Sequence, residues 1–163
     1  MCLCIIHKIT FLIKEVIKIN IFFLDFDGVT HPDACGENLE FCRLPFIERT
    51  LRPFLGEWKI VISSNWKNIQ KLDQLKKYFS DDIRDHIVGV TPTIKAVRNP
   101  FESRGKEIEK FISEHNVDRF IIIDDMIKFL SVSQRKYAVT TDSRQGFTNK
   151  SRNRLLFLLN KFK

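Results

Sequence analysis

The sequence has few of the residues that mark disordered, fibrous or disulfide-rich proteins. Its 163 residues include six glycines, five prolines and four cysteines, and they contain no fixed-period repeat or low-complexity tract. The cysteines, at positions 2, 4, 35 and 42, fit no metal-ligand spacing, and the first two are too close together for an easy disulfide. With 44% hydrophobic and 29% charged residues, the composition is that of one ordinary globular domain. We therefore expect a reduced protein of the cytoplasm.

A long apolar run is also missing. The most hydrophobic stretch, residues 5–21, is interrupted by polar and charged side chains: His7, Lys8, Lys14, Glu15 and Lys18. A membrane-spanning helix needs about 18 or more consecutive apolar residues, and a signal peptide needs an unbroken apolar segment. The sequence therefore predicts neither a membrane span nor a secretion signal, and no membrane partner.

The net charge of +7 is concentrated at one end of the chain. Residues 1–125 hold 18 Lys and Arg against 19 Asp and Glu, whereas residues 126–163 hold nine basic residues against Asp142 alone. Such a basic segment attracts phosphate groups through a sequence-independent electrostatic term, so nucleic acid is a candidate partner. A solvated face that keeps the protein soluble is the alternative. Charge alone leaves both interpretations open.

Short apolar runs alternate with helical patterns along the chain. Strands are predicted at residues 21–24, 59–62, 120–123 and 137–140, with a candidate fifth at 86–90. Apolar residues recur at helical spacing within 44–55, 69–79, 108–115 and 155–162, and Asn65 is a candidate N-cap for the second of these helices. This alternation predicts an α/β protein: a three-layer, Rossmann-like parallel sheet with helices on both faces. Its ligands should bind beyond the carboxyl ends of the strands.

Two carboxylates close the first predicted strand. Asp25 and Asp27 follow four apolar residues and precede Gly28. An ionised carboxylate at the end of a buried strand is costly unless it is paired or bound to a cation. A strand running into an Asx-type turn could also place Asp and Gly there, but it accounts less well for two carboxylates. The pattern therefore indicates a cation site.

Two further strand ends carry polar residues. Ser63 follows the second strand, and Asp124 and Asp125 follow the one at 120–123. The order Asp-x-Asp-Gly, a hydroxyl, a Lys and Asp-Asp resembles the haloacid dehalogenase superfamily of phosphohydrolases. The flanking runs resemble, more narrowly, the haloacid dehalogenase domain of Swiss Army Knife RNA repair proteins; they are Asp-Gly-Val-Thr-His-Pro, Cys-Arg-Leu-Pro, Val-Gly-Val-Thr-Pro and Thr-Asp followed by Gly-Phe-Thr. The resemblance covers about residues 21–159, which implies one domain over 21–163 and leaves an N-terminal extension, 1–20, unassigned.

The resemblance implies a Mg²⁺-dependent phosphomonoesterase. Asp25 would be the nucleophile that forms an aspartyl-phosphate. Asp27 would be the general acid that protonates the leaving oxygen and then the base that activates water. Mg²⁺ would be held by the Asp25 carboxylate, the Asp27 main-chain carbonyl and Asp124, with Asp125 binding directly or through water.

Phosphate contacts follow from the same resemblance. Ser63 would donate a hydrogen bond to a phosphoryl oxygen, and Lys106 would neutralise the transferring group. The alternative for Ser63 is a plain helix N-cap, although Ser64 or Asn65 could supply that cap instead. The alternative for Lys106 is an exposed helical lysine, with Arg104 as the competing basic residue. Further candidate substrate contacts are His31, Ser64, Asn65 and Arg144, and Trp66 is expected in the core or as a base-stacking platform. Asn65 and Lys67 stand where Ser and Arg are commoner in the family.

The spacing of the motifs bears on the substrate. About 32 residues separate Thr30 from Ser63, which leaves little room for a cap domain, and residues 91–103 are a candidate flap. An open site and the basic C-terminal segment favour a phosphorylated nucleic-acid end. A small-molecule or nucleotide phosphatase and a non-catalytic phosphate-binding or interaction module are the alternatives, and the oligomeric state is left open.

Overall fold

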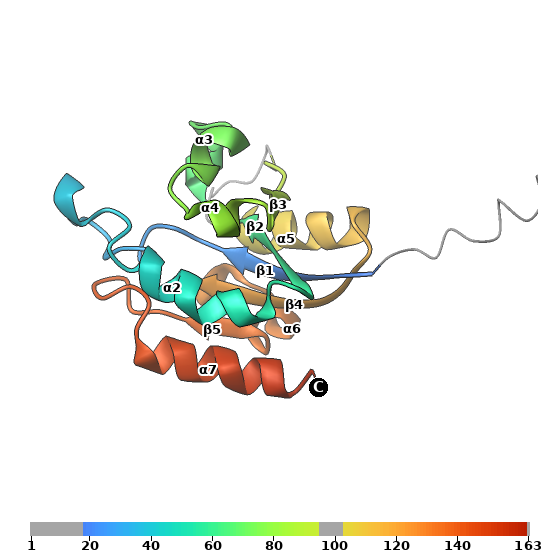
Figure 1. Cartoon of the computed structure of the whole chain (residues 1–163). Helices are drawn as coiled ribbons and strands as arrows, with labels where there is room; N and C mark the ends of the chain where they lie inside the picture. Colours follow the sequence, from blue (N-terminus) through green and yellow to red (C-terminus); the bar gives the residue numbers. More distant parts are fainter. Residues whose placement is uncertain (1–17, 95–102, 163) are drawn as a thin grey trace, which may run out of the picture.

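A computed structural model describes residues 18–94 and 103–162. These residues build a five-stranded, all-parallel sheet in the order β3-β2-β1-β4-β5 (Figure 1). The strands are β1 (Ile19–Leu24), β2 (Trp58–Ile62), β3 (Ile87–Val90), β4 (Val117–Asp124) and β5 (Ala138–Thr140). The prediction of an α/β protein with a parallel sheet is confirmed, and the candidate fifth strand is present. β1 begins two residues earlier than predicted, within the segment assigned to the N-terminal extension.

Helices cover both faces of the sheet. α2 (Leu44–Leu51) and α7 (Asn149–Asn160) lie on one face and α5 (Ser103–Glu114) on the other, which gives the predicted three layers (Figure 1). Shorter helices complete the described chain: α3 (Leu72–Lys76), α4 (Asp81–Arg84), α6 (Val132–Arg135), and the 3-10 turns η1 (Glu37–Leu39), η2 (Arg52–Phe54), η3 (Asn65–Asn68) and η5 (Ile127–Phe129).

The central strand β1 has two buried sides because side chains alternate across a strand. Phe22 and Leu24 pack into the core that α2 and α7 complete, while Ile21 and Phe23 pack into the core under α5. All four side chains are fully buried. The residues that follow β1 are therefore held by a strand that is packed on both faces, and this rigidity fixes where the site can form.

The helix predicted over residues 69–79 is broken in the structure. Ser64, and not Asn65, is the N-cap of η3, since its hydroxyl accepts from the Trp66 amide at 3.5 Å. η3 ends at Asn68, and the Ile69 side chain is 78% exposed although the pattern placed it on the buried face. Lys67, within η3, makes tertiary contacts with Glu107 and Thr91 that the apolar spacing does not encode.

Among the described residues, no separate cap domain covers the carboxyl end of the sheet. Between β1 and β2 the chain forms only η1, α2 and η2, and between β2 and β3 only η3, α3 and α4. Most of the candidate flap at 91–103 lies outside the described residues. None of the described helices has the length and apolar character needed to cross a lipid bilayer.

Candidate active site

The carboxyl ends of β1, β2 and β4 bring three predicted site residues together. β1 pairs in parallel register with β2 on one side and β4 on the other, so Asp25, Ser63 and Asp124 meet at one edge of the sheet. The pairing continues past the strand ends, because the Asp25 amide donates to the Ile123 carbonyl (3.1 Å) and the Ser63 amide to the Leu24 carbonyl (2.8 Å). The parallel topology thus places a nucleophile candidate between a hydroxyl and a second carboxylate.

Three carboxylates form a compact cluster at this edge. One ligand oxygen from each of Asp25, Asp124 and Asp125 lies within 4.8 Å of the others. Burial and the neighbouring charge of Asp25 raise the pKa of Asp124 to about 7 and that of Asp125 to about 6. A bound cation would relieve this repulsion, and carboxylate oxygens are the ligands that Mg²⁺ prefers. These residues therefore fit the Mg²⁺ that the family resemblance implies.

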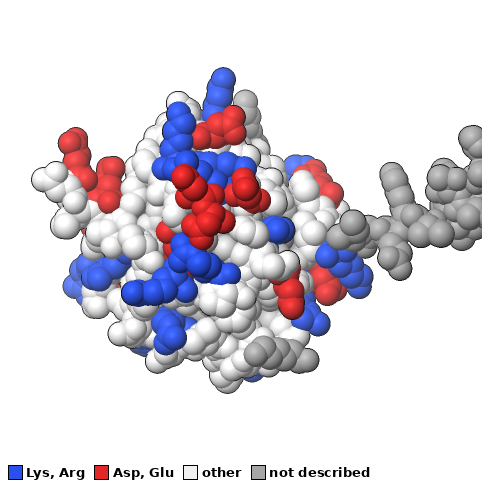
Figure 2. All heavy atoms as spheres, in the orientation of Figure 1, with Lys and Arg blue, Asp and Glu red and all other residues white. Residues whose placement is uncertain are grey.

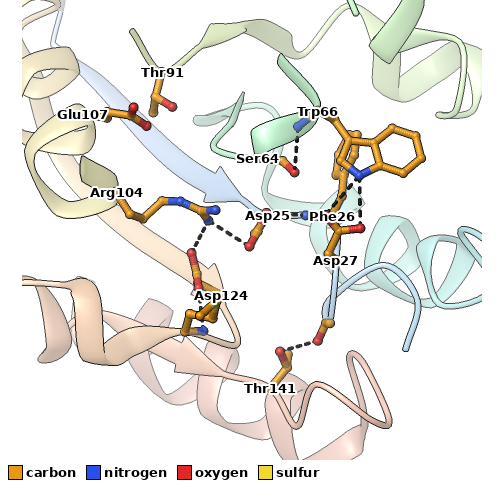
Figure 3. Close-up of polar contacts among 12 residues, drawn as sticks. Asp25, Phe26, Asp27, Ser64, Trp66, Thr91, Arg104, Glu107, Asp124 and Thr141 are labelled. Carbon is orange, nitrogen blue, oxygen red and sulfur yellow. Dashed lines mark hydrogen bonds and ion pairs between the residues drawn. The ribbon is translucent and has the colours of Figure 1, made fainter. Parts of the chain in front are cut away.

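Arg104 is the basic residue that contacts the cluster. Its Nη1 lies 2.8 Å from Asp25 Oδ2 and 2.5 Å from Asp124 Oδ2 (Figure 3). Lys106 is exposed and faces a different hollow beside Glu109. The structure thus corrects the placement of Lys106 in the phosphate site. Residues two apart on a helix point about 200° from each other, so α5 can present only one of the two basic residues to the sheet.

The Ser63 hydroxyl is left without a partner beside this cluster. Ser63 is 1% exposed, and its Oγ makes no hydrogen bond to any described residue. A buried hydroxyl without a partner is unfavourable, and a phosphoryl oxygen would be a suitable acceptor. The capping function considered for this segment belongs to Ser64. The geometry therefore leaves Ser63 available to a ligand.

The side chain of Asp27 points away from the three clustered carboxylates. Trp66 Nε1 donates to both of its oxygens at 3.0 Å (Figure 3), and His31 Nε2 lies 3.2 Å from Oδ1. Its side chain is 47% exposed, in contrast to that of Asp25. Trp66 is neither a plain core residue nor a free stacking platform, and His31 is a buried partner of Asp27. The Asp27 side chain is therefore separate from the carboxylate cluster, which consists of Asp25, Asp124 and Asp125.

Gly28 is required by the close packing of the loop. Its φ of +68° lies in the left-handed region, and a Cβ at this position would come within 2.8 Å of Asp125 Cγ. The Thr141 hydroxyl donates to the Gly28 carbonyl at 2.7 Å and ties the loop to the end of β5 (Figure 3). The glycine after Asp27 thus allows Asp125 to approach β1.

The remaining predicted contacts lie outside the cluster. Asn65 is exposed, and the Arg144 side chain is 88% exposed and lies 3.6 Å from Asp142. Neither of these residues contacts the clustered carboxylates. Any role they have in substrate binding would be peripheral.

One buried ion pair near the site was missed from the sequence. Lys67 Nζ lies 2.5 Å from Glu107 and donates to the Thr91 hydroxyl at 2.9 Å. Burial lowers the pKa of Lys67, although Glu107 opposes the shift. Glu107 lies one turn after Arg104 on α5, so the pair connects η3, the end of β3 and the helix that carries Arg104. The only sequence signal was the presence of Lys67 where the family commonly has Arg.

A known protein family matches most of the chain. Residues 21–151 match the family described as the HAD domain in Swiss Army Knife RNA repair proteins. No curated protein matches the chain. A solved hydrolase of the haloacid dehalogenase-like family from Streptococcus pneumoniae is 15% identical, with 90% of this chain and 99% of that chain covered and a TM-score of 0.48. The family match spans the strand ends and α5, and on that ground the chain belongs to the family of haloacid dehalogenase (HAD) domains found in Swiss Army Knife RNA repair proteins.

Proposed function

We propose that the protein is a Mg²⁺-dependent phosphomonoesterase that works through an aspartyl-phosphate on Asp25. The observation that supports this most strongly is the cluster of Asp25, Asp124 and Asp125 beside the unpartnered Ser63 hydroxyl. Three clustered carboxylates and an unbonded hydroxyl would destabilise a protein that had no ligand to place there. A cation and a phosphoryl group together satisfy all four side chains.

In the first step Asp25 attacks phosphorus and the bond to the leaving oxygen breaks. The Phe26 amide donates to Asp25 Oδ1 at 2.8 Å, and Arg104 contacts Oδ2, so both oxygens of the nucleophile have fixed positions. Asp27 gives its proton to the leaving oxygen. When bound, Mg²⁺ would offset the repulsion between the carboxylates and the phosphate dianion.

The second step releases phosphate and restores the enzyme. Asp27, now ionised, takes a proton from water, and the water oxygen attacks the phosphorus of the aspartyl-phosphate. The bond between phosphorus and the Asp25 oxygen breaks, so Asp25 is again a carboxylate and Asp27 is again protonated. Ser63 donates to a phosphoryl oxygen in both steps.

Removing Mg²⁺ is expected to stop the reaction. In excess chelator, phosphate release should fall at least about 100-fold, because the carboxylates would then repel the substrate, and added Mg²⁺ should restore it. The assay measures phosphate released from oligonucleotides phosphorylated at the 3′ or 5′ end and from a panel of phosphorylated metabolites. A thermal melt with and without Mg²⁺ provides an independent readout, since a bound ion raises the melting temperature. Full activity in chelator would contradict the proposed metal site.

We further propose that the substrate is a phosphorylated nucleic-acid end. The site has no cap domain among the described residues, and the family is described by its place in RNA repair proteins. On the face seen in Figure 2, Lys and Arg side chains lie in the region of α2 and also in that of α3 and α4, with acidic side chains among them. Arg144, in the loop after β5, and Lys150 and Arg152, in the first turn of α7, are exposed toward the carboxyl end of the sheet.

Other basic residues of the C-terminal segment have structural partners. Arg135 donates to the carbonyls of Leu130 and Lys128, and Arg154 donates to those of Ala138 and Lys136. Arg154 is therefore less suitable for a binding test than the exposed Arg144, Lys150 and Arg152. Replacing it would remove main-chain contacts as well as charge.

Neutralising Arg144, Lys150 and Arg152 to Gln is expected to separate the two substrate classes. KM for a phosphorylated oligonucleotide should rise roughly tenfold. The slope of log affinity against log salt concentration should become shallower by about 0.7 for each lost contact with a single strand. Turnover of a small aryl phosphate should stay unchanged. The matched control replaces Lys136 and Lys161, which lie at the opposite end of the sheet, with Gln. Equal effects on both substrates, or on neither, would favour a small-molecule phosphatase.

A further inference from the structure

Asp27 is held by two side chains that have no contact with the clustered carboxylates. Trp66 comes from η3, after β2, and donates through Nε1 to both oxygens of Asp27 at 3.0 Å. His31 comes from the loop after β1, with its Nε2 at 3.2 Å from Oδ1. Neither residue takes part in the nucleophilic step or in the carboxylate cluster, so their convergence on one carboxylate calls for its own explanation.

The contacts of the His31 ring suit it as a donor to Asp27. The ring is buried, and its Nδ1 lies 3.0 Å from the Thr30 hydroxyl and 3.4 Å from the amide of Phe41. An ionised carboxylate oxygen can only accept, so the contact between Nε2 and Asp27 is a hydrogen bond when Nε2 carries the proton, and the Phe41 amide, which can only donate, is then a partner for Nδ1. His31 therefore donates to Asp27, as Trp66 does.

An aromatic cluster fixes the two donors in turn. The Phe41 ring lies edge-on to both His31 and Trp66, with ring centres 5.4 Å away in each case, and it stacks on Tyr78 at 4.1 Å. Phe41 has a φ of +58°, a left-handed conformation that costs about 1 kcal/mol for a residue with a side chain. In this strained conformation the Phe41 ring packs against both His31 and Trp66, and the Phe41 amide contacts the His31 ring.

We propose that Trp66 and His31 are positioning residues that orient Asp27 for proton transfer. This inference rests on the proposed function and deepens it. The half-exposed Asp27 side chain would otherwise rotate freely, and a general acid must meet the leaving oxygen within hydrogen-bonding distance. Oδ1 accepts from both donors whereas Oδ2 accepts from Trp66 alone, so Oδ2 is the oxygen that carries the transferred proton.

The test compares leaving groups in Trp66→Phe, which removes the indole N–H and keeps an aromatic ring. An alkyl phosphate needs a proton on its leaving oxygen, whereas p-nitrophenyl phosphate leaves as a stable phenolate. We expect kcat/KM for the alkyl phosphate to fall at least about tenfold and that for the aryl phosphate to change by less than about threefold. A purely structural role would lower both values by the same factor.

A second pair of variants tests the other donor. His31→Gln keeps an N–H that can reach Asp27 and should retain most of the alkyl-phosphate activity, whereas His31→Leu should show the same selective loss as Trp66→Phe. The matched control is Trp58→Phe. Trp58 is buried against Phe22 with ring centres 4.6 Å apart, and its replacement should leave the ratio of the two kcat/KM values unchanged even where stability falls.

The outcomes separate the inference from the proposed function. Uniform losses on both phosphates, or no loss in Trp66→Phe and His31→Leu, would overturn the positioning role while the phosphatase assignment stands. A wild-type protein that hydrolyses neither phosphate in the presence of Mg²⁺ would overturn the proposed function and this inference together.

Discussion

Asp25→Asn is expected to reduce phosphate release at least about 10³-fold, the largest effect that we predict for a single substitution. The amide nearly keeps the shape of the carboxylate but cannot attack phosphorus. It also removes one of the three clustered negative charges, so the fold should be retained. The measurements are kcat/KM for phosphate release and a thermal melt of the same preparation.

A control and a direct readout accompany this variant. Asp33→Asn changes an exposed carboxylate in the same loop and should leave activity within about twofold of wild type. Mass spectrometry of rapidly quenched wild-type protein should detect one phosphoryl group on the peptide that contains Asp25. Asp25→Asn should show none. Activity of the variant within about tenfold of wild type would remove Asp25 from the nucleophile's role.

Arg104→Ala is expected to have the second largest effect, and it reduces both activity and stability. Without the guanidinium, Asp25 and Asp124 lose their ion pair in a buried site, and breaking such a pair costs about 3–5 kcal/mol. The free energy of unfolding should fall by an amount in this range in chelator and by less in Mg²⁺, because the cation supplies part of the lost charge. kcat/KM should fall at least about 100-fold.

Lys106→Ala provides the matched comparison on the same helix. Lys106 is exposed and does not contact the cluster, so activity and unfolding free energy should stay close to the wild-type values. Arg104→Lys keeps a positive charge and should recover part of the activity if charge near Asp25 is what matters. A severe loss in Lys106→Ala with a mild one in Arg104→Ala would mean that α5 is rotated relative to the arrangement described above.

The architecture followed from the sequence because each strand carries its own signal. The four apolar residues before Asp25 are all buried, and a run of this kind predicts a central strand whichever helices later cover it. Residues 65–79 show where this reasoning fails. Their apolar spacing predicts one helix. In the structure Trp66 donates hydrogen bonds to Asp27, and Lys67 forms an ion pair with Glu107. Contacts between residues that are far apart in sequence leave no trace in the local spacing of apolar residues.

The candidate site likewise combines residues that the sequence identified with contacts that only the tertiary structure determined. Asp25, Ser63, Asp124 and Asp125 could be found from the sequence because each lies at or just after the carboxyl end of a strand, and parallel strands bring these ends to one edge. The choice between Arg104 and Lys106 depended on the rotation of α5 about its axis, which its packing against the sheet decides. The contacts of Asp27 with Trp66 and His31 likewise depend on how two loops fold against each other. The position of each strand along the chain follows from the local pattern, whereas strand order and side-chain direction are settled only when the elements pack.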